Sequence, residues 1–134
     1  MRVMVFVKAT EESERGAKPT PEMLAAMGKF NDELSDAGVM VAAAGLLRSA
    51  EGKRVAFDGA ARTVVDGPFA GVGELVAGFW IWEVRDMDEA VAWAKRCPNP
   101  MPGPSVLELR PFLEGEQLAA FLTPDAQATP RAGP

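Results

Sequence analysis

The sequence predicts an α+β domain in which two helices pack on one antiparallel β-sheet. Three observations lead to this prediction. Four segments have the apolar, β-branched character of strands, two have the periodicity of amphipathic helices, and strands and helices alternate along the chain. The 134 residues suit a single domain. With 48% hydrophobic and 25% charged residues, the composition is that of a globular protein.

The first strand and the first helix have clear signals. Residues 3–7 form a continuous apolar run, which predicts a strand buried on both faces. The polar segment 10–18 is interpreted as a loop. Thr20 is the expected N-cap of the helix that follows, with Pro21 in its first turn and Gly38 after its end. One apolar stripe of this helix is expected to face the sheet: Met23, Leu24, Met27, Phe30 and Leu34.

The middle of the chain predicts a weak strand and a hairpin. Residues 39–47 are apolar but rich in alanine and glycine, which weakens the expected strand. Residues 54–57 and 62–65 flank an Asp58-Gly59 turn and predict a β-hairpin. The hairpin is therefore expected as an insertion between two strands of the main sheet.

The strongest strand and the second helix follow. Residues 75–84 predict the strongest strand of the chain. Asp86 is the expected N-cap of a helix that ends at Cys97, because a proline disfavours helical backbone in the residue before it. Residues 106–112 predict the last strand. This order corresponds to a ferredoxin-like, split βαβ sheet with an inserted hairpin.

Both faces of the central strands are apolar, and this predicts a homodimer. Phe79 and Ile81 point to one side of their strand, whereas Trp80 and Trp82 point to the other. Two helices cover only one face of the sheet, and burying an aromatic side chain is worth roughly 2–3 kcal/mol. We therefore expect the open sheet faces of two copies to pack symmetrically, with Trp80 and Trp82 at the dimer interface.

Composition excludes several classes of function. The net charge of −5 disfavours a surface for nucleic acid. Without histidine and with Cys97 as its one cysteine, the chain has no disulfide framework, no Cys/His zinc site and no histidine-activated nucleophile. Neither a cofactor nor a metal is expected. No apolar run is long enough for a membrane span, so a cytoplasmic location is the expectation.

Asp66 is the candidate catalytic residue. It ends a predicted strand immediately before Gly67-Pro68, where a carboxylate can face a pocket and act as an acid or a base. The alternative is an Asx-type turn, in which the carboxylate accepts hydrogen bonds from backbone N–H groups of its own turn.

The candidate ligand-binding residues lie on strands or beside them: Lys8, Phe69, Trp80, Glu108 and Arg110. Glu108 and Arg110 share one face of the last strand, so the guanidinium can orient a carboxylate ligand. Alternatively, they form a solvated pair on an edge strand. Trp80, Trp82 and Phe69 either line a pocket or pack in a core or interface. Cys97 is interpreted as inert, because the negative end of a helix dipole raises a thiol pKa.

Four motifs in register resemble the YCII-related proteins, in particular the branch named for its DGPF motif. The motifs occupy residues 66–69, 78–84, 88–98 and 108–111. The resemblance covers about residues 1–113, which leaves 114–122 as a short helical extension and 123–134 as a predicted disordered tail. It implies the dimeric α+β barrel fold. A His–Asp pair proposed for the wider YciI-like group has no counterpart here, because the chain lacks histidine.

Three functions follow as hypotheses. The first is a small homodimer that holds an organic anion in a pocket between the sheet and the first helix, or that has an accessory role. The second is a cofactor-independent enzyme of the isomerase, lyase or dehalogenase type, with Asp66 transferring the proton and Arg110 holding the anion. The third is an interaction module linked to transcription, because the resemblance implies an association of some members with extracytoplasmic-function sigma factors.

Overall fold

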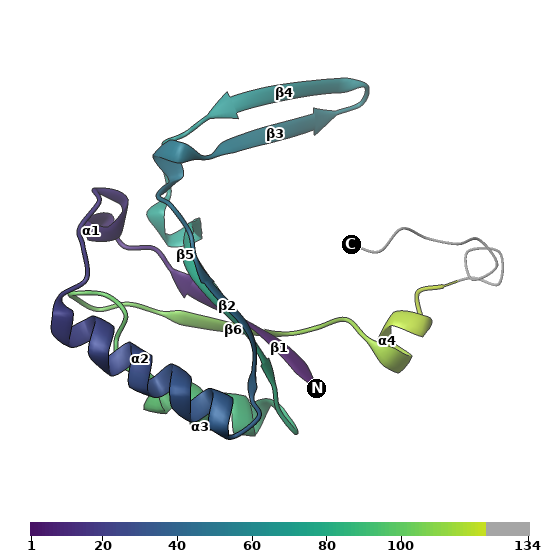
Figure 1. Ribbon diagram of the computed structural model, residues 1–134. Coiled ribbons are helices and arrows are strands. Elements are labelled where there is room, and N and C mark those ends of the chain that lie inside the picture. The colour runs from purple at the N-terminus through teal and green to yellow at the C-terminus, as the bar shows by residue number, and fades with distance from the viewer. Residues whose placement is uncertain (123–134) are drawn as a thin grey trace.

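The computed structural model describes residues 1–122 and contains a four-stranded antiparallel sheet (Figure 1). Its strands are β1 (Arg2–Lys8), β2 (Met40–Gly45), β5 (Val76–Glu83) and β6 (Leu107–Pro111), in the spatial order β2-β5-β1-β6. The first and third main strands are therefore central, and the predicted α+β fold is confirmed. The segment 123–134, predicted as a disordered tail, lies outside the described residues.

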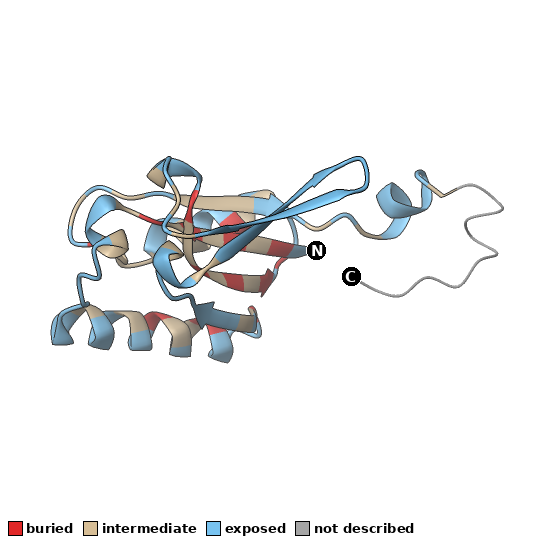
Figure 2. Ribbon diagram, turned by 90° about the horizontal axis from the view of Figure 1, so that it is seen from above, coloured by how far each residue is buried: buried red, intermediate tan, exposed pale blue. Residues whose placement is uncertain are grey.

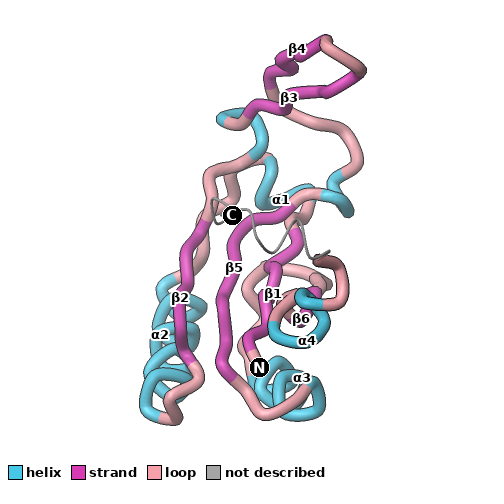
Figure 3. Tube along the Cα trace, turned by 90° about the vertical axis from the view of Figure 1, so that its right-hand side faces the viewer, coloured by secondary structure: helices cyan, strands magenta, loops and turns pink. Residues whose placement is uncertain are grey.

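One face of this sheet is covered by helices, and the other is left open by the described residues 1–122 (Figure 3). Val3, Val5 and Val7 are buried on the covered side of β1, whereas the residues between them are half-buried on the opposite side. The strand register places Phe6 beside Phe79 and Met4 beside Ile81. The open face is turned toward the reader in Figure 3. The register and the alternation of the strands place four apolar side chains at its centre: Met4, Phe6, Phe79 and Ile81.

The two long helices are α2 (Pro21–Asp36) and α3 (Met87–Arg96). Each begins as predicted: the Thr20 hydroxyl accepts from the backbone N–H of Met23 at 3.1 Å, and the Asp86 carboxylate accepts from Glu89 N–H at 2.9 Å. The prediction that Leu24 belongs to the apolar stripe facing the sheet is wrong, because its side chain is exposed. Within residues 1–122, neither these nor the shorter helices have the length and apolar character of a membrane span.

The two tryptophans of β5 lie under α2 and form the core. Trp82 is fully buried and Trp80 nearly so. Phe30 of α2 packs edge-on against both indoles, with ring centroids 6.0 Å from Trp80 and 6.3 Å from Trp82. The prediction that Trp80 and Trp82 form the dimer interface is therefore wrong, because these side chains are enclosed by their own chain. The apolar open face is formed by their sequence neighbours instead.

The segment interpreted as a loop at 10–18 contains a helical turn, α1 (Glu11–Glu14). Its signal is a capping box: the Thr10 hydroxyl accepts from Ser13 N–H at 3.2 Å, and the Ser13 hydroxyl accepts from Thr10 N–H at 2.9 Å. Two 3-10 turns, η1 (Ser49–Glu51) and η2 (Val72–Glu74), flank the hairpin, and a short helix α4 (Gly115–Ala119) follows β6. Helix α4 falls inside the predicted extension.

The predicted hairpin is present as a separate two-stranded sheet, β3 (Lys53–Asp58) and β4 (Ala61–Asp66). We call residues 53–66 the hairpin arm. It projects away from the main sheet, and every residue of both strands is exposed (Figure 2). Valines are therefore buried in β1 but exposed in the arm.

Candidate functional site

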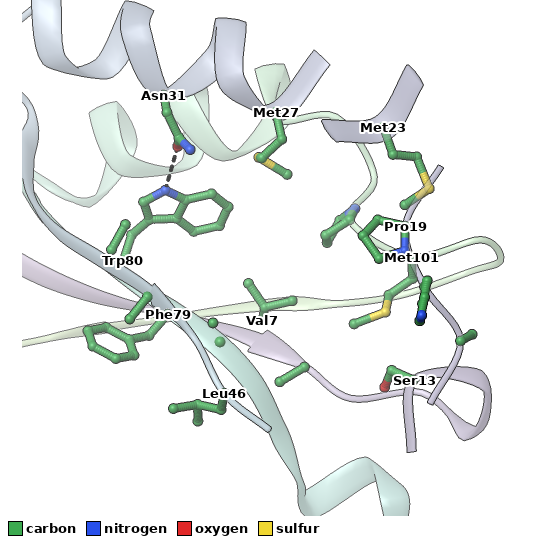
Figure 4. Close-up of a pocket in the computed structure, with 18 of the residues that line it drawn as sticks. Val7, Ser13, Pro19, Met23, Met27, Asn31, Leu46, Phe79, Trp80 and Met101 are labelled. Carbon is green, nitrogen blue, oxygen red and sulfur yellow. Dashed lines mark hydrogen bonds between the residues drawn. The ribbon is translucent and has the colours of Figure 1, made fainter. Parts of the chain in front are cut away.

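A cavity of about 590 Å³ lies between the sheet and the N-terminal half of α2 (Figure 4). Its floor is made by β5 and the end of β2, its roof by α2, and its far wall by the loop 100–102. This is the place where the sequence predicted a pocket, between the sheet and the first long helix. The volume suits a small organic molecule.

The walls of the cavity are largely apolar. Met23 and Met27 extend from α2, Met101 from the loop, and Val7 and Trp80 from the sheet (Figure 4). Methionine side chains are flexible and polarisable, so three of them make a wall that adapts to the shape of an aromatic or aliphatic ligand. The lining therefore favours a molecule that is mostly apolar.

Asn31 gives the cavity an oriented polar group. Its side-chain oxygen accepts a hydrogen bond from the indole N–H of Trp80 at 2.9 Å, which fixes the amide (Figure 4). Within residues 1–122 the amide nitrogen of Asn31 has no hydrogen-bond partner, so it is available to donate to a ligand.

Lys18 adds a positive charge. Its exposed side chain lines the cavity ahead of α2, and within the described residues it has no ion-pair partner. An ammonium group beside an apolar cavity attracts an anionic ligand. Sequence reasoning missed both Lys18 and Asn31. Asn31 had a detectable signal, because it is a polar residue one turn after Met27 on the apolar stripe.

The far wall is held in place by Asn99. Its side-chain oxygen accepts from Met101 N–H at 3.0 Å and from the Ser105 hydroxyl at 2.6 Å, and its amide nitrogen donates to the carbonyl of Gly103 at 2.9 Å. The Thr10 hydroxyl also contacts the Met101 sulfur at 3.6 Å. These bonds fix the proline-rich loop, so this wall is largely preformed.

Asp66 does not line the cavity of its own chain. It lies at the base of the hairpin arm, where its carboxylate pairs with the Lys53 ammonium at 2.6 Å across the two strands. Both side chains are exposed. The bond to Lys53 differs from the predicted Asx turn, and the catalytic role of Asp66 stays a prediction.

Three of the predicted ligand-binding residues gather on the open face of the sheet, not at the cavity. The Glu108 carboxylate lies 3.3 Å from Arg110 and 3.9 Å from Lys8. Phe69 is elsewhere again, with its ring 4.0 Å from the Arg54 guanidinium at the base of the arm. Trp80 alone among the five lines the cavity. The structure therefore separates the predicted site into three places.

Cys97 is half-buried beside the core, and its thiol donates to the carbonyl of Pro98 at 3.2 Å. Burial raises the pKa of this thiol to about 11, which leaves it protonated and weakly nucleophilic at neutral pH. In residues 1–122, no group of three His, Cys, Asp or Glu side chains has the geometry to hold a metal ion.

Fold and cavity together define a small α+β protein with a two-helix layer, an open sheet face and an apolar pocket. The chain belongs to the YCII-related domain family, which it matches over residues 1–113. The family predicted from the four motifs is thus confirmed. No curated protein sequence matches the chain.

A solved structure with the same fold is 5-chloro-2-hydroxyhydroquinone dehydrochlorinase from Burkholderia phenoliruptrix, in complex with 2,5-dihydroxybenzoquinone. The two chains have 14% sequence identity and a TM-score of 0.51, over 87% of this chain and 97% of that one. At this level of identity, the similarity shows the fold.

Proposed function

We propose that this YCII-related protein binds a small, mostly apolar organic anion in the cavity between the sheet and α2. The observation that carries the proposal is the combination of Lys18, without an ion-pair partner in residues 1–122, with the free amide nitrogen of Asn31 beside three methionine side chains. The methionines and Trp80 contact the body of the ligand. The ammonium and the amide hold its charged end.

The proposed ligand is a benzoate-sized carboxylate or a phenolate. A cavity of about 590 Å³ accommodates one aromatic ring with its substituents. A doubly charged aliphatic acid fits less well, because the apolar walls offer nothing to replace the water around a second charge. Aromatic monoanions are therefore expected to bind more tightly than short dicarboxylates.

The test is a thermal-shift screen followed by calorimetry. Benzoate, hydroxybenzoates and 2,5-dihydroxybenzoquinone are compared with succinate as the disfavoured ligand. Lys18→Met removes the cation and keeps most of the length of the side chain, and Lys29→Met on the exposed side of α2 is the matched control. We expect Lys18→Met to weaken binding roughly tenfold, a loss of about 1.4 kcal/mol. Equal affinity in the two variants contradicts the proposed role of Lys18.

The protein is further proposed to be a homodimer that packs through its open sheet faces. Met4, Phe6, Phe79 and Ile81 are only half-buried by residues 1–122, because α2 and α3 pack on the opposite face of the sheet. A symmetric pair removes this apolar patch from water on both copies at once. Light scattering across a dilution series tests it: a single monomer mass at every concentration contradicts the dimer.

The alternative is that the protein is a cofactor-independent enzyme. The structural neighbour is a dehydrochlorinase, which supports this alternative. Within the described lining of the cavity there is no carboxylate, and Lys18 is the titratable side chain present. Asp66 therefore needs to reach a bound molecule from outside this cavity. Chloride release from chlorinated hydroquinones, measured for the natural chain and for Asp66→Asn, is the test. Equal rates for both chains contradict a role for Asp66.

A further inference from the structure

One face of the hairpin arm has an apolar centre, with the Lys53–Asp66 ion pair at its base and Arg62 near its tip. Residues paired across the two strands share a face, so Val55 lies beside Val64, and Phe57 follows on the same side. All three side chains are about half exposed or more, and Phe57 reaches 72%. Phe57 is capped by Arg62, whose guanidinium lies 4.6 Å from the ring centroid. The other face has smaller side chains at its centre, Ala56 and Thr63, with Val65 beside them.

The base of the arm is fixed to the body of the chain. Both the backbone N–H and the hydroxyl of Ser49 donate to the Glu14 carboxylate, and Ser49 in turn accepts from Phe69 N–H at 3.0 Å. A Cβ atom at Gly67 would overlap the Ser49 carbonyl oxygen, so this glycine allows the closest approach. The DGPF segment therefore builds a rigid base that gives the arm a defined direction.

That direction is toward the open side of the sheet. Figures 1 and 3 show the helices on one side of the sheet and the arm projecting on the other. Helix α4 lies on the same side as the arm, held by an ion pair between Arg2 and Glu114, and leaves Leu118 and Phe121 exposed. The arm, the open face and helix α4 thus lie on the same side of the sheet (Figures 1 and 3), and each has exposed or half-buried apolar side chains.

A second copy of this chain suits that side of the sheet. A two-stranded hairpin is marginally stable alone, and an exposed apolar ladder is prone to association. Packing against another surface would therefore stabilise the arm. Its sequence has three basic and two acidic side chains, whereas the whole chain has a net charge of −5. The arm is therefore positive and the rest of a second chain negative, which favours their contact. Under two-fold symmetry each chain supplies one arm and accepts one.

We infer that the hairpin arm is an intersubunit clasp, whose Val55, Phe57 and Val64 face packs against the body of the second copy. The inference rests on the proposed homodimer and adds to it a contact outside the sheet faces. It also assigns the DGPF segment a role in assembly: its residues hold the arm where the second copy receives it.

The experiment is hydrogen exchange of the natural chain, read by mass spectrometry at protein concentrations below and above dimer formation. The peptide covering 53–66 is expected to exchange at least tenfold more slowly in the concentrated sample, because its amides become covered. The C-terminal end of α2, residues 31–36, lies on the covered side of the sheet; it is the internal control and is expected to stay unchanged. Light scattering on the same samples reports the mass.

Matched variants identify the face of the arm. Phe57→Ser with Val64→Thr alters the apolar face, and Val65→Thr makes the same valine change on the opposite face. We expect the first variant to weaken dimerisation by at least about tenfold and to abolish the protection of 53–66, and the second to change it less than about twofold.

The outcomes separate the two proposals. A dimer of unchanged affinity whose arm is unprotected overturns the clasp and leaves the homodimer standing. A monomer at every concentration overturns both. Protection that arises in a monomer only after a different purified protein is added assigns the arm to that protein and overturns the clasp between copies. Ligand binding in the cavity is measured separately and is unaffected by any of these results.

Discussion

The four-stranded sheet and the hairpin arm contain the same kind of residue and use it in opposite ways. Val3 and Val5 of β1 are 0% exposed, whereas Val55 and Val64 of the arm are 49% and 60% exposed. Both regions have β-branched residues in paired antiparallel strands. The difference is a second layer: helices α2 and α3 cover one face of the sheet, and nothing in residues 1–122 covers the arm. Local sequence therefore forms a strand, but burial depends on what packs against it.

The largest expected effect on the free energy of unfolding comes from truncating a core side chain on the covered side of the sheet. Trp82→Ala removes a fully buried indole, and the cavity it leaves is expected to lower the free energy of unfolding by about 3–5 kcal/mol. Val55→Ala in the arm is the matched comparison and is expected to cost less than about 0.5 kcal/mol in dilute, monomeric protein. Urea denaturation followed by circular dichroism measures both. Similar losses for the two variants contradict the contrast between sheet and arm.

The next effect tests the junction between the two regions. In Gly67→Ala, the new methyl group would overlap the Ser49 carbonyl oxygen, so the backbone has to shift, and the expected cost is about 1–3 kcal/mol. Gly73→Ala is the control, because nothing lies within 4 Å of its added Cβ atom. Amide chemical shifts distinguish the variants: those of the arm and of Ser49 are expected to move in Gly67→Ala alone. An unperturbed arm in that variant contradicts the rigid base.

The elements of the fold could be predicted from the sequence, because their signals are local. Three signals were sufficient to predict the helices, the hairpin and the fold class: the Thr20 and Asp86 caps, the Asp58-Gly59 turn and the order of the elements. Which face of β5 the helices cover was not predictable, because both faces are apolar. Alternation separates Phe79 from Trp80 but does not say which of them meets a helix. Here the larger indoles fill the space under α2 and the smaller side chains stay outside.

The site was predictable in position but not in composition. A pocket between the sheet and the first long helix was expected, yet Lys18, Asn31 and Met101 line it from three separate segments. The loop that brings Met101 there depends on the hydrogen bonds of Asn99, which no periodic pattern indicates. The predicted Glu108–Arg110 pair does form, but on the open face, because the side of β6 that faces the helices is occupied by Leu107 and Leu109.

A smaller effect separates the structural role of Asn31 from its role in binding. Asn31→Leu removes the acceptor of the Trp80 indole N–H and is expected to cost about 1 kcal/mol, at the lower end for an unpaired donor because the site is only partly buried. Asn31→Asp keeps an acceptor and is expected to retain most of that stability. It places a negative charge beside the cavity, however, so benzoate binding should fall further than in Asn31→Leu. Asn31→Asp is thus expected to be the more stable of the two variants but the weaker binder. Urea denaturation measures the stability of both variants, and calorimetry measures their affinity for benzoate.

The smallest effect is expected on the open face, where Glu108 lies between Lys8 and Arg110. The Glu108→Gln change removes two ion pairs, but Glu108 and Arg110 are substantially exposed, so solvent screens the interactions and the expected loss in the monomer is below about 1 kcal/mol. Arg85→Gln, which breaks the ion pair of an exposed arginine with Glu89 in the first turn of α3, is the control. If the open faces pack together, Glu108→Gln alters the dimerisation constant while Arg85→Gln does not, because a charge cluster removed from water interacts more strongly than one in solvent. Equal, small effects of both variants on monomer stability and on dimerisation would place Glu108, on the edge strand β6, outside the interface.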